Sequence, residues 1–177
     1  GGLFGGGSAP TTPAPQRLSG VRMQSSTFGL PKQIVYGRHR ITGNIIWYGD
    51  FLSTPQTSQG GSGGKGGGGG GGGSPQVTGY QYSASVAIGL CEGQVSGIIS
   101  IWEGKKIVNG IQGSPTTNNF KGMLPGGGQA KFTGAAGQAA WSYLTSKYPA
   151  QALNYPGLAY ISATKVDLGN NASLPNY

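Results

Sequence analysis

Apolar and polar residues alternate along two stretches of the chain, and each of these stretches predicts β structure. In residues 80–90, the even positions are aromatic, alanine or aliphatic, and the odd positions are mainly glutamine, serine and other small residues. This period of two is typical of a strand with one buried face. A similar alternation runs from Val35 to Trp47 and places His39 on the apolar face, and Leu158–Asp167 has the same strand character.

Glycines and short turns punctuate these strands. Gly37, Gly43 and Gly49 recur every six residues, and isolated glycines in strands favour bulges and bends. We therefore expect a curved sheet or a small barrel. Val95–Trp102 and Lys106–Val108 predict a hairpin with Glu103-Gly104-Lys105 as its turn, and Asn109–Gly128 is typical of a loop.

One helix is predicted near the C-terminal end. Apolar residues at positions 136, 139, 140, 143 and 144 follow the i, i+3, i+4, i+7 spacing of a helix face. Lys147 suits the C-terminal end of the helix dipole, and Pro149 prevents continuation. The order of strands, helix and strand indicates a β-rich α+β fold.

Two glycine-rich segments divide the chain. Gly60–Gly73 is broken only by Ser62 and Lys65 and cannot contribute a packed core, because glycine has no side chain to bury. We expect a long disordered loop at 56–76, inserted in a domain of residues 20–177. Residues 1–19 predict an extended Gly/Pro-rich arm, with Leu3 and Phe4 as its apolar anchors. Because the chain starts at Gly1 and not at Met, and stops abruptly at Tyr177, we expect it to be a segment of a longer polypeptide.

Composition then narrows the function. Charged residues make up 9% of the chain, and the net charge is +8, whereas a soluble monomer normally has more surface charge. The pattern favours a surface covered by neighbouring subunits. A basic net charge also makes nucleic acid a possible partner. The cations are scattered along the sequence, however, and only Arg38/Arg40 and Lys105/Lys106 form close pairs. Arg38 and Arg40 are therefore candidate assembly contacts, and no specific nucleic acid is expected.

No catalytic constellation is evident in the sequence. His39 is the single histidine, and a packed strand histidine explains it better than a catalytic base. Cys91 stands alone, which favours a small buried hydrophobe over a metal or disulfide site. The glycine tract lacks the Lys-Ser/Thr ending of a phosphate-binding loop, and Tyr80 and Tyr82 fit core packing better than base stacking. We therefore expect no catalytic, cofactor or metal residues. We also expect no membrane anchor, because no apolar stretch reaches 18 residues.

Three phrases resemble one known family. Residues 21–51 (VRMQSSTFGLPKQIVYGRHRITGNIIWYGDF), 82–107 (YSASVAIGLCEGQVSGIISIWEGKKI) and 141–177 occur in the order found in tail-tip hub proteins of long-tailed bacteriophages (siphophages), also called host-specificity or central-fibre proteins. The middle phrase is similar to the family's GLCEGPI element, and it makes Gly89, Cys91, Glu92 and Gly93 a structural turn. Gln94 departs from the family, in which proline is frequent at this position.

The resemblance implies a structural role in the virion. Such hubs assemble as homotrimers at the tail tip, join the distal tail ring to the central fibre, and enclose the end of the tape-measure protein. It also implies β-barrel-like hub domains, of which this chain would be the N-terminal part. The protein would take part in host attachment, would assemble in the host cytoplasm, and would have no enzymatic activity. Two alternatives stay open: a module that binds a cell-surface glycan or nucleic acid, and a cell-wall hydrolase that uses His39.

Overall fold

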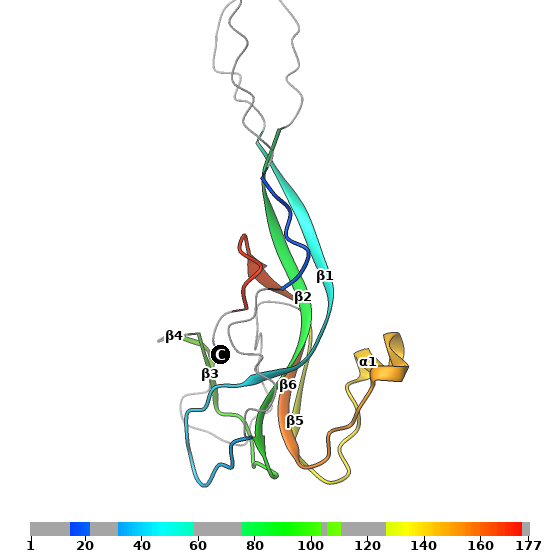
Figure 1. Ribbon diagram of the computed structural model, residues 1–177. Coiled ribbons are helices and arrows are strands. Elements are labelled where there is room, and N and C mark those ends of the chain that lie inside the picture. The colour runs from blue at the N-terminus through cyan, green and yellow to red at the C-terminus, as the bar shows by residue number, and fades with distance from the viewer. Residues whose placement is uncertain (1–14, 22–31, 59–75, 104–105, 111–126, 175–177) are drawn as a thin grey trace, which may run out of the picture.

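The computed structural model describes residues 15–21, 32–58, 76–103, 106–110 and 127–174, and these residues form a mostly antiparallel β structure with one short helix (Figure 1). The prediction of a β-rich α+β fold is confirmed. The elements in chain order are β1 (Asn44–Ser58), β2 (Gln76–Glu92), β3 (Ser100–Glu103), β4 (Lys106–Gly110), β5 (Gly127–Thr133), α1 (Ser142–Lys147), a 3₁₀ turn η1 (Pro149–Gln151) and β6 (Leu158–Gly169).

Four strands make one sheet in the order β1-β2-β6-β5, and β3 pairs with β4 in a separate hairpin. All neighbours are antiparallel, and register shifts interrupt each pairing in the sheet. Such bulges bend strands and increase their twist, and β1 and β2 are visibly curved in Figure 1. The prediction of a curved sheet punctuated by bulges is confirmed.

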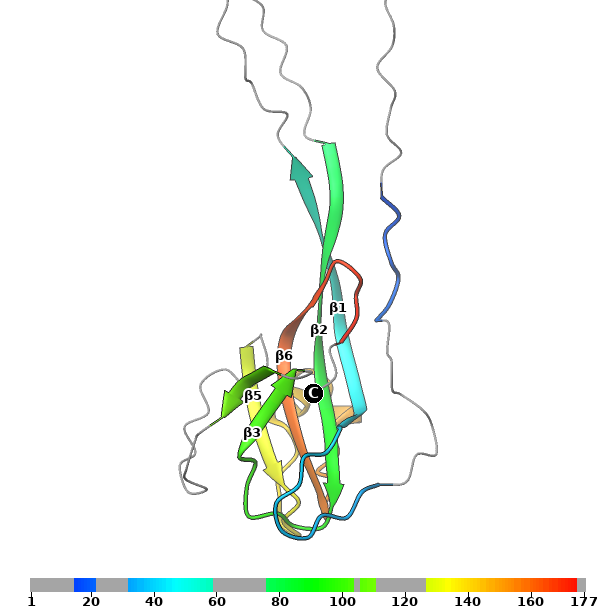
Figure 2. The same ribbon diagram turned by 90° about the vertical axis from the view of Figure 1, so that its left-hand side faces the viewer.

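The β1–β2 hairpin is longer than the rest of the sheet. β6 pairs with β2 only from Tyr82 onward, whereas β1 and β2 stay paired as far as Ser58 and Gln76. Figure 2 shows the two strands continuing as a narrow ribbon beyond β6. Residues 56–58 and 76, which were expected in the glycine-rich loop, are therefore paired strand, and Gly60–Gly73 lies outside the described residues.

The middle of β2 is buried on both faces, which corrects the expectation of a half-buried strand. Residues 84–89 are all buried, including the serine and alanine at the positions predicted to face solvent. The reason is that elements pack on both sides of the sheet. Figure 1 shows the β3–β4 hairpin on one side and α1 on the other.

The first core layer lies on the side of the β3–β4 hairpin. Its buried residues come from β2, β3, β6 and the segment after β6: Tyr82, Ala84, Val86, Ile88, Ile101, Ile161, Ala163, Val166, Leu168, Ala172 and Leu174. Phe51 stacks on Tyr82 with ring centroids 5.4 Å apart. The end of the N-terminal arm also contributes, because Leu18 packs here and its backbone N–H donates to the Tyr82 hydroxyl at 2.8 Å.

The second core layer is aromatic and fastens α1 to the other face. Trp141 is buried at 2% exposure, and its ring lies 5.9 Å from that of Trp47 in an edge-on arrangement. Phe132 stacks on Tyr160 at 4.0 Å between centroids. Edge-on and offset aromatic pairs stabilise beyond the area that they bury. A six-residue helix cannot hold itself in water, so this aromatic packing is what fixes it.

The predicted helix is shorter than its pattern suggested. Residues 136–141 are not helical, and α1 spans only Ser142–Lys147. The Gln138 side chain explains the difference, since its amide nitrogen donates to the carbonyls of Asn154, Tyr155 and Leu158 at 2.6–3.0 Å. Its oxygen accepts the Gly134 N–H at 2.9 Å. These tertiary bonds hold the segment in a turn.

Two strand assignments also need correction. The strand expected from Val35 begins only at Asn44, because Gly37 adopts a positive φ of 73° that turns the chain. Conversely, β5 was missed, since Gly127–Thr133 has neither alternation nor β-branched residues except at its end. The hairpin prediction is confirmed by the β3–β4 pairing, although Val95–Ile99 lies outside the strand and Gly104-Lys105 lies outside the described residues.

Candidate assembly surface

An irregular, exposed segment leads into β1, and we term residues 32–40 the basic strip. It is attached to the end of β2 by an isolated parallel bridge between Ile34 and Glu92, in which the Glu92 N–H donates to the Gln33 carbonyl at 2.8 Å. Ile34 is 64% exposed and Tyr36 is 83% exposed. Large apolar side chains exposed next to each other are typical of a contact surface.

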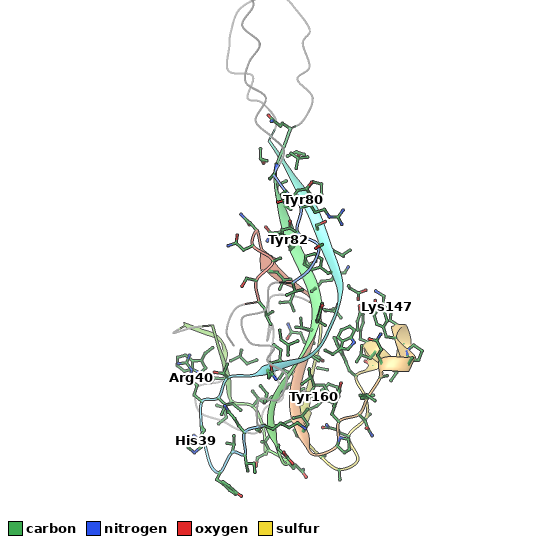
Figure 3. All side chains as sticks on the ribbon, viewed as in Figure 1. His39, Arg40, Tyr80, Tyr82, Lys147 and Tyr160 are labelled. Carbon is green, nitrogen blue, oxygen red and sulfur yellow. The ribbon has the colours of Figure 1, made fainter. Side chains whose placement is uncertain are left out.

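Cations gather on the same strip. Lys32, Arg38 and Arg40 are exposed, and the Arg40 guanidinium lies over the Trp102 ring at 4.6 Å from its centroid. This cation–π contact orients the guanidinium. Figure 3 shows Arg40 and His39 on the side of the molecule away from Lys147. His39 is exposed, so its predicted place in the core is wrong, because the turn at Gly37 takes the segment off the sheet.

A hollow of about 820 Å³ lies between the basic strip, the sheet and the segment before β3. Its floor is apolar and comes from β2 and β6: Ile88, Leu90, Cys91, Ala159 and Ile161. Arg38, His39, Arg40 and Trp102 line the hollow from the strip and from β3. An apolar floor with cations around it suits a ligand that combines apolar groups with negative charge.

The predicted structural turn lies at one end of this hollow. Cys91 is buried, as predicted, and burial raises the pKa of its thiol, which leaves it in the unreactive protonated form at neutral pH. β2 ends at Glu92, and Gly93 has a positive φ of 90° while its N–H donates to the Gly157 carbonyl at 2.7 Å. Gly89 is buried where a Cβ would lie 2.9 Å from a methyl carbon of Ile46.

A second polar cluster lies on the opposite face of the sheet, next to α1. Lys147 Nζ donates to Asp50 Oδ1 at 2.6 Å, and the Tyr148 hydroxyl donates to the same oxygen at 2.5 Å. The Asp50 side chain is only 16% exposed, whereas that of Lys147 is 50% exposed. Asp50 and Phe51 lie in a bulge opposite a single residue of β2, and Asp50 has a positive φ of 51°. The cluster joins β1 to the end of α1, so its role is structural.

The Asp50 cluster gives a pH prediction. Burial by itself raises the pKa of Asp50, but the hydrogen bonds from Lys147 and Tyr148 outweigh it and lower the pKa below its ordinary value of 3.8. A lowered pKa stabilises the fold above the unfolded value and loses that contribution as pH falls through the folded value. We expect Asp50→Asn, which tolerates the positive φ, to lower the urea midpoint at pH 6 and to lose less stability than the wild type between pH 6 and pH 3. Equal pH dependence in the two proteins would contradict this, and Glu92→Gln, which removes an exposed carboxylate, is the matched control.

Within the part of the chain that the structure describes, no three histidine, cysteine or acidic residues come together as metal ligands. The helix described there is too short to cross a membrane. His39 lines the hollow, and none of the described acids forms a hydrogen bond or ion pair with its side chain.

The predicted assembly residues have different outcomes. Arg38 and Arg40 lie together on the basic strip, at the hollow, and Leu3 and Phe4 lie outside the described residues. Sequence reasoning missed Ile34, Tyr36 and Trp102. Ile34 and Tyr36 share the even positions with Arg38 and Arg40, the face that the alternation predicted to be polar, and only the fold brings Trp102 of β3 next to Arg40.

Comparison with known proteins adds a shared fold. No protein-family model and no curated protein matches this chain. A chain in the solved virion of a native gene transfer agent particle is similar to it, with a TM-score of 0.52 and 16% sequence identity. The match covers 94% of this chain and 29% of that chain, so the present chain spans less than a third of that protein. At this identity the likeness shows that the two share a fold.

Proposed function

We propose that this chain is a structural subunit of a phage-like virion. The observation that carries the proposal is the likeness to a chain of a gene transfer agent virion over 94% of the present sequence. The low content of charged residues, 9% of the chain, supports it, because a surface of this kind is usually covered in an assembly. The exposed apolar side chains of the basic strip are a second argument for contact with neighbours.

More specifically, we propose the hub of the tail tip. In this role three copies close the end of the tail tube, join the distal tail ring to the central fibre, and surround the end of the tape-measure protein. The glycine-rich arm of residues 1–19 ends on its own chain, where Leu18 packs, and its beginning would run along a neighbouring copy, because segments that order on assembly can wrap large surfaces. The role is structural and not enzymatic, and its place is the virion.

The test uses the purified protein and purified particles. We expect trimers by light scattering at micromolar concentration and rings in negative-stain images, and we expect the protein in purified particles by mass spectrometry. A monomer at that concentration would overturn the hub assignment, and absence from the particles would overturn the virion role. Clearing of cell-wall material in a gel assay, lost in His39→Ala, would instead support the hydrolase alternative.

A further inference from the structure

The basic strip and its hollow have a chemistry that selects a particular partner. We infer that they bind an extended, acidic polypeptide segment of a different subunit, with its apolar side chains in the hollow and its carboxylates on Arg38 and Arg40. Because the inference names a partner within the particle, it rests on the proposed function. The partner segment would alternate acidic and apolar residues, so that one set faces the floor and the other faces the arginines.

The apolar half of the site is already formed. Its floor belongs to the two central strands of the sheet, whose lining side chains are mostly buried, and the apolar side chains that stay partly exposed at the hollow include Leu90, Ile98 and Ile99. Strands packed on both faces give a rigid platform. A volume of about 820 Å³ accommodates several aliphatic side chains, and it falls in the usual range of binding pockets, about 300–1,000 Å³.

The charged half is arranged as a rim. Arg38 and Arg40 are both exposed and both line the hollow, and the contact with Trp102 preorganises Arg40. Guanidinium groups bind carboxylates with two parallel hydrogen bonds. Among the described side chains, one acid, Glu92, adjoins the strip, whereas the strip itself carries Lys32, Arg38 and Arg40. The described rim of the hollow is therefore mainly positive.

A second copy of this chain cannot supply the carboxylates. The whole sequence has four acidic residues against 12 basic ones. Asp50 is bound by Lys147 and Tyr148, and Asp167 accepts hydrogen bonds from Gln81 and from the backbone N–H of Gly169. The four acids stand at positions 50, 92, 103 and 167, so no short segment of this chain carries two carboxylates that could reach both arginines. Charge complementarity therefore points to a subunit of different sequence.

The inference is tested with the 177-residue chain and a fluorescein-labelled peptide of alternating glutamate and leucine. The matched peptide carries glutamine in place of glutamate. By fluorescence anisotropy at low salt, we expect the acidic peptide to bind at least tenfold more tightly than the glutamine peptide. We expect Arg38→Gln/Arg40→Gln to weaken binding of the acidic peptide at least tenfold. Arg38→Gln alone keeps the Arg40 guanidinium on the Trp102 ring and should therefore weaken binding of the acidic peptide less than the double variant does.

The controls separate a site from a general charge effect. Arg17→Gln/Lys165→Gln removes the same two charges from exposed positions elsewhere and should change binding by less than twofold. Ser96→Phe places a ring at the wall of the hollow. It should weaken binding of the acidic peptide, whose leucines would enter the hollow, and leave the midpoint of urea unfolding unchanged. Equal weakening by both double variants, or no binding of the acidic peptide, would overturn the inference.

Two further outcomes are distinguishable. Tighter binding of a single-stranded oligonucleotide than of the peptide, lost in Arg38→Gln/Arg40→Gln, would overturn the inference in favour of a nucleic-acid surface. Trimers or rings without peptide binding would overturn the inference and leave the proposed function standing. Peptide binding by a chain that is absent from particles would overturn the proposed function, and with it the partner's place in the particle.

Discussion

Replacement of Gly134 by alanine is expected to lower the free energy of unfolding by on the order of 3 kcal/mol, through backbone strain at a positive φ together with overpacking. Gly134 has a φ of 84°, and a Cβ there would lie 2.6 Å from the Gly93 carbonyl oxygen. The Ala159 backbone nitrogen would lie 3.1 Å away. Both are main-chain atoms, so neither can rotate away from the added methyl group. The midpoint of urea unfolding measures the effect.

Gly137→Ala is the matched control for this substitution. Gly137 lies three residues further along the same turn, and a Cβ there would meet nothing within 4 Å. We expect its stability to change by less than about 0.5 kcal/mol. Equal loss of stability in the two variants would show that the close approach of the chain at Gly93 and Gly134 is not the cause of the loss. The same close approach places the segment that walls the hollow, since the Val95 N–H donates to the Thr133 carbonyl at 2.9 Å, so Gly134→Ala should also weaken peptide binding.

Truncation of Trp141 to alanine is expected to cost about 3–5 kcal/mol, the usual range for a buried tryptophan. Trp141 is 2% exposed at the start of α1, and its ring lies 4.9 Å from that of Tyr143 and 5.9 Å from that of Trp47. The helix has no side-chain cap at its N-terminus, so this packing is its main attachment. Near-ultraviolet circular dichroism and urea unfolding report the loss.

Two variants bracket the expected result. Trp141→Phe keeps an aromatic ring in the layer and should lose clearly less than alanine. Leu153→Ala removes an apolar side chain that is 56% exposed and should change stability by less than about 0.5 kcal/mol. A wild-type midpoint in Trp141→Ala would mean that α1 is held by the Asp50 cluster and not by the aromatic layer.

Much of the strand framework could be predicted from local pattern. Alternation over residues 80–90 identified β2, because a strand that packs against a core repeats its apolar positions every second residue, and the strand character of residues 158–167 identified β6. Cys91 was correctly expected to be buried, because a lone cysteine is usually a small buried hydrophobe. Pattern could not find β5, whose pairing with β6 depends on the partner strand and not on its own residues.

The candidate site was the least predictable part. Residues 35–41 alternate like a strand, and the arginines at 38 and 40 were predicted to be assembly contacts without any sign of the hollow beside them. Gly37 takes a positive φ, which the sequence permits but does not require, and this single dihedral converts an expected core strand into an exposed strip. Likewise, the apolar spacing of residues 136–144 fits a helix, yet the bonds that Gln138 makes to residues 154–158 outweigh it.

The sequence by itself determined that the chain is rich in β-strands, poor in charge and basic in balance, because these follow from residue type and period alone. Only the tertiary structure decided which strands meet, where α1 begins, and that Arg40, Trp102 and the floor of β2 and β6 surround one hollow. The physical reason is distance along the chain: these contacts join segments tens of residues apart, and their free energy is gained only once the whole sheet has assembled.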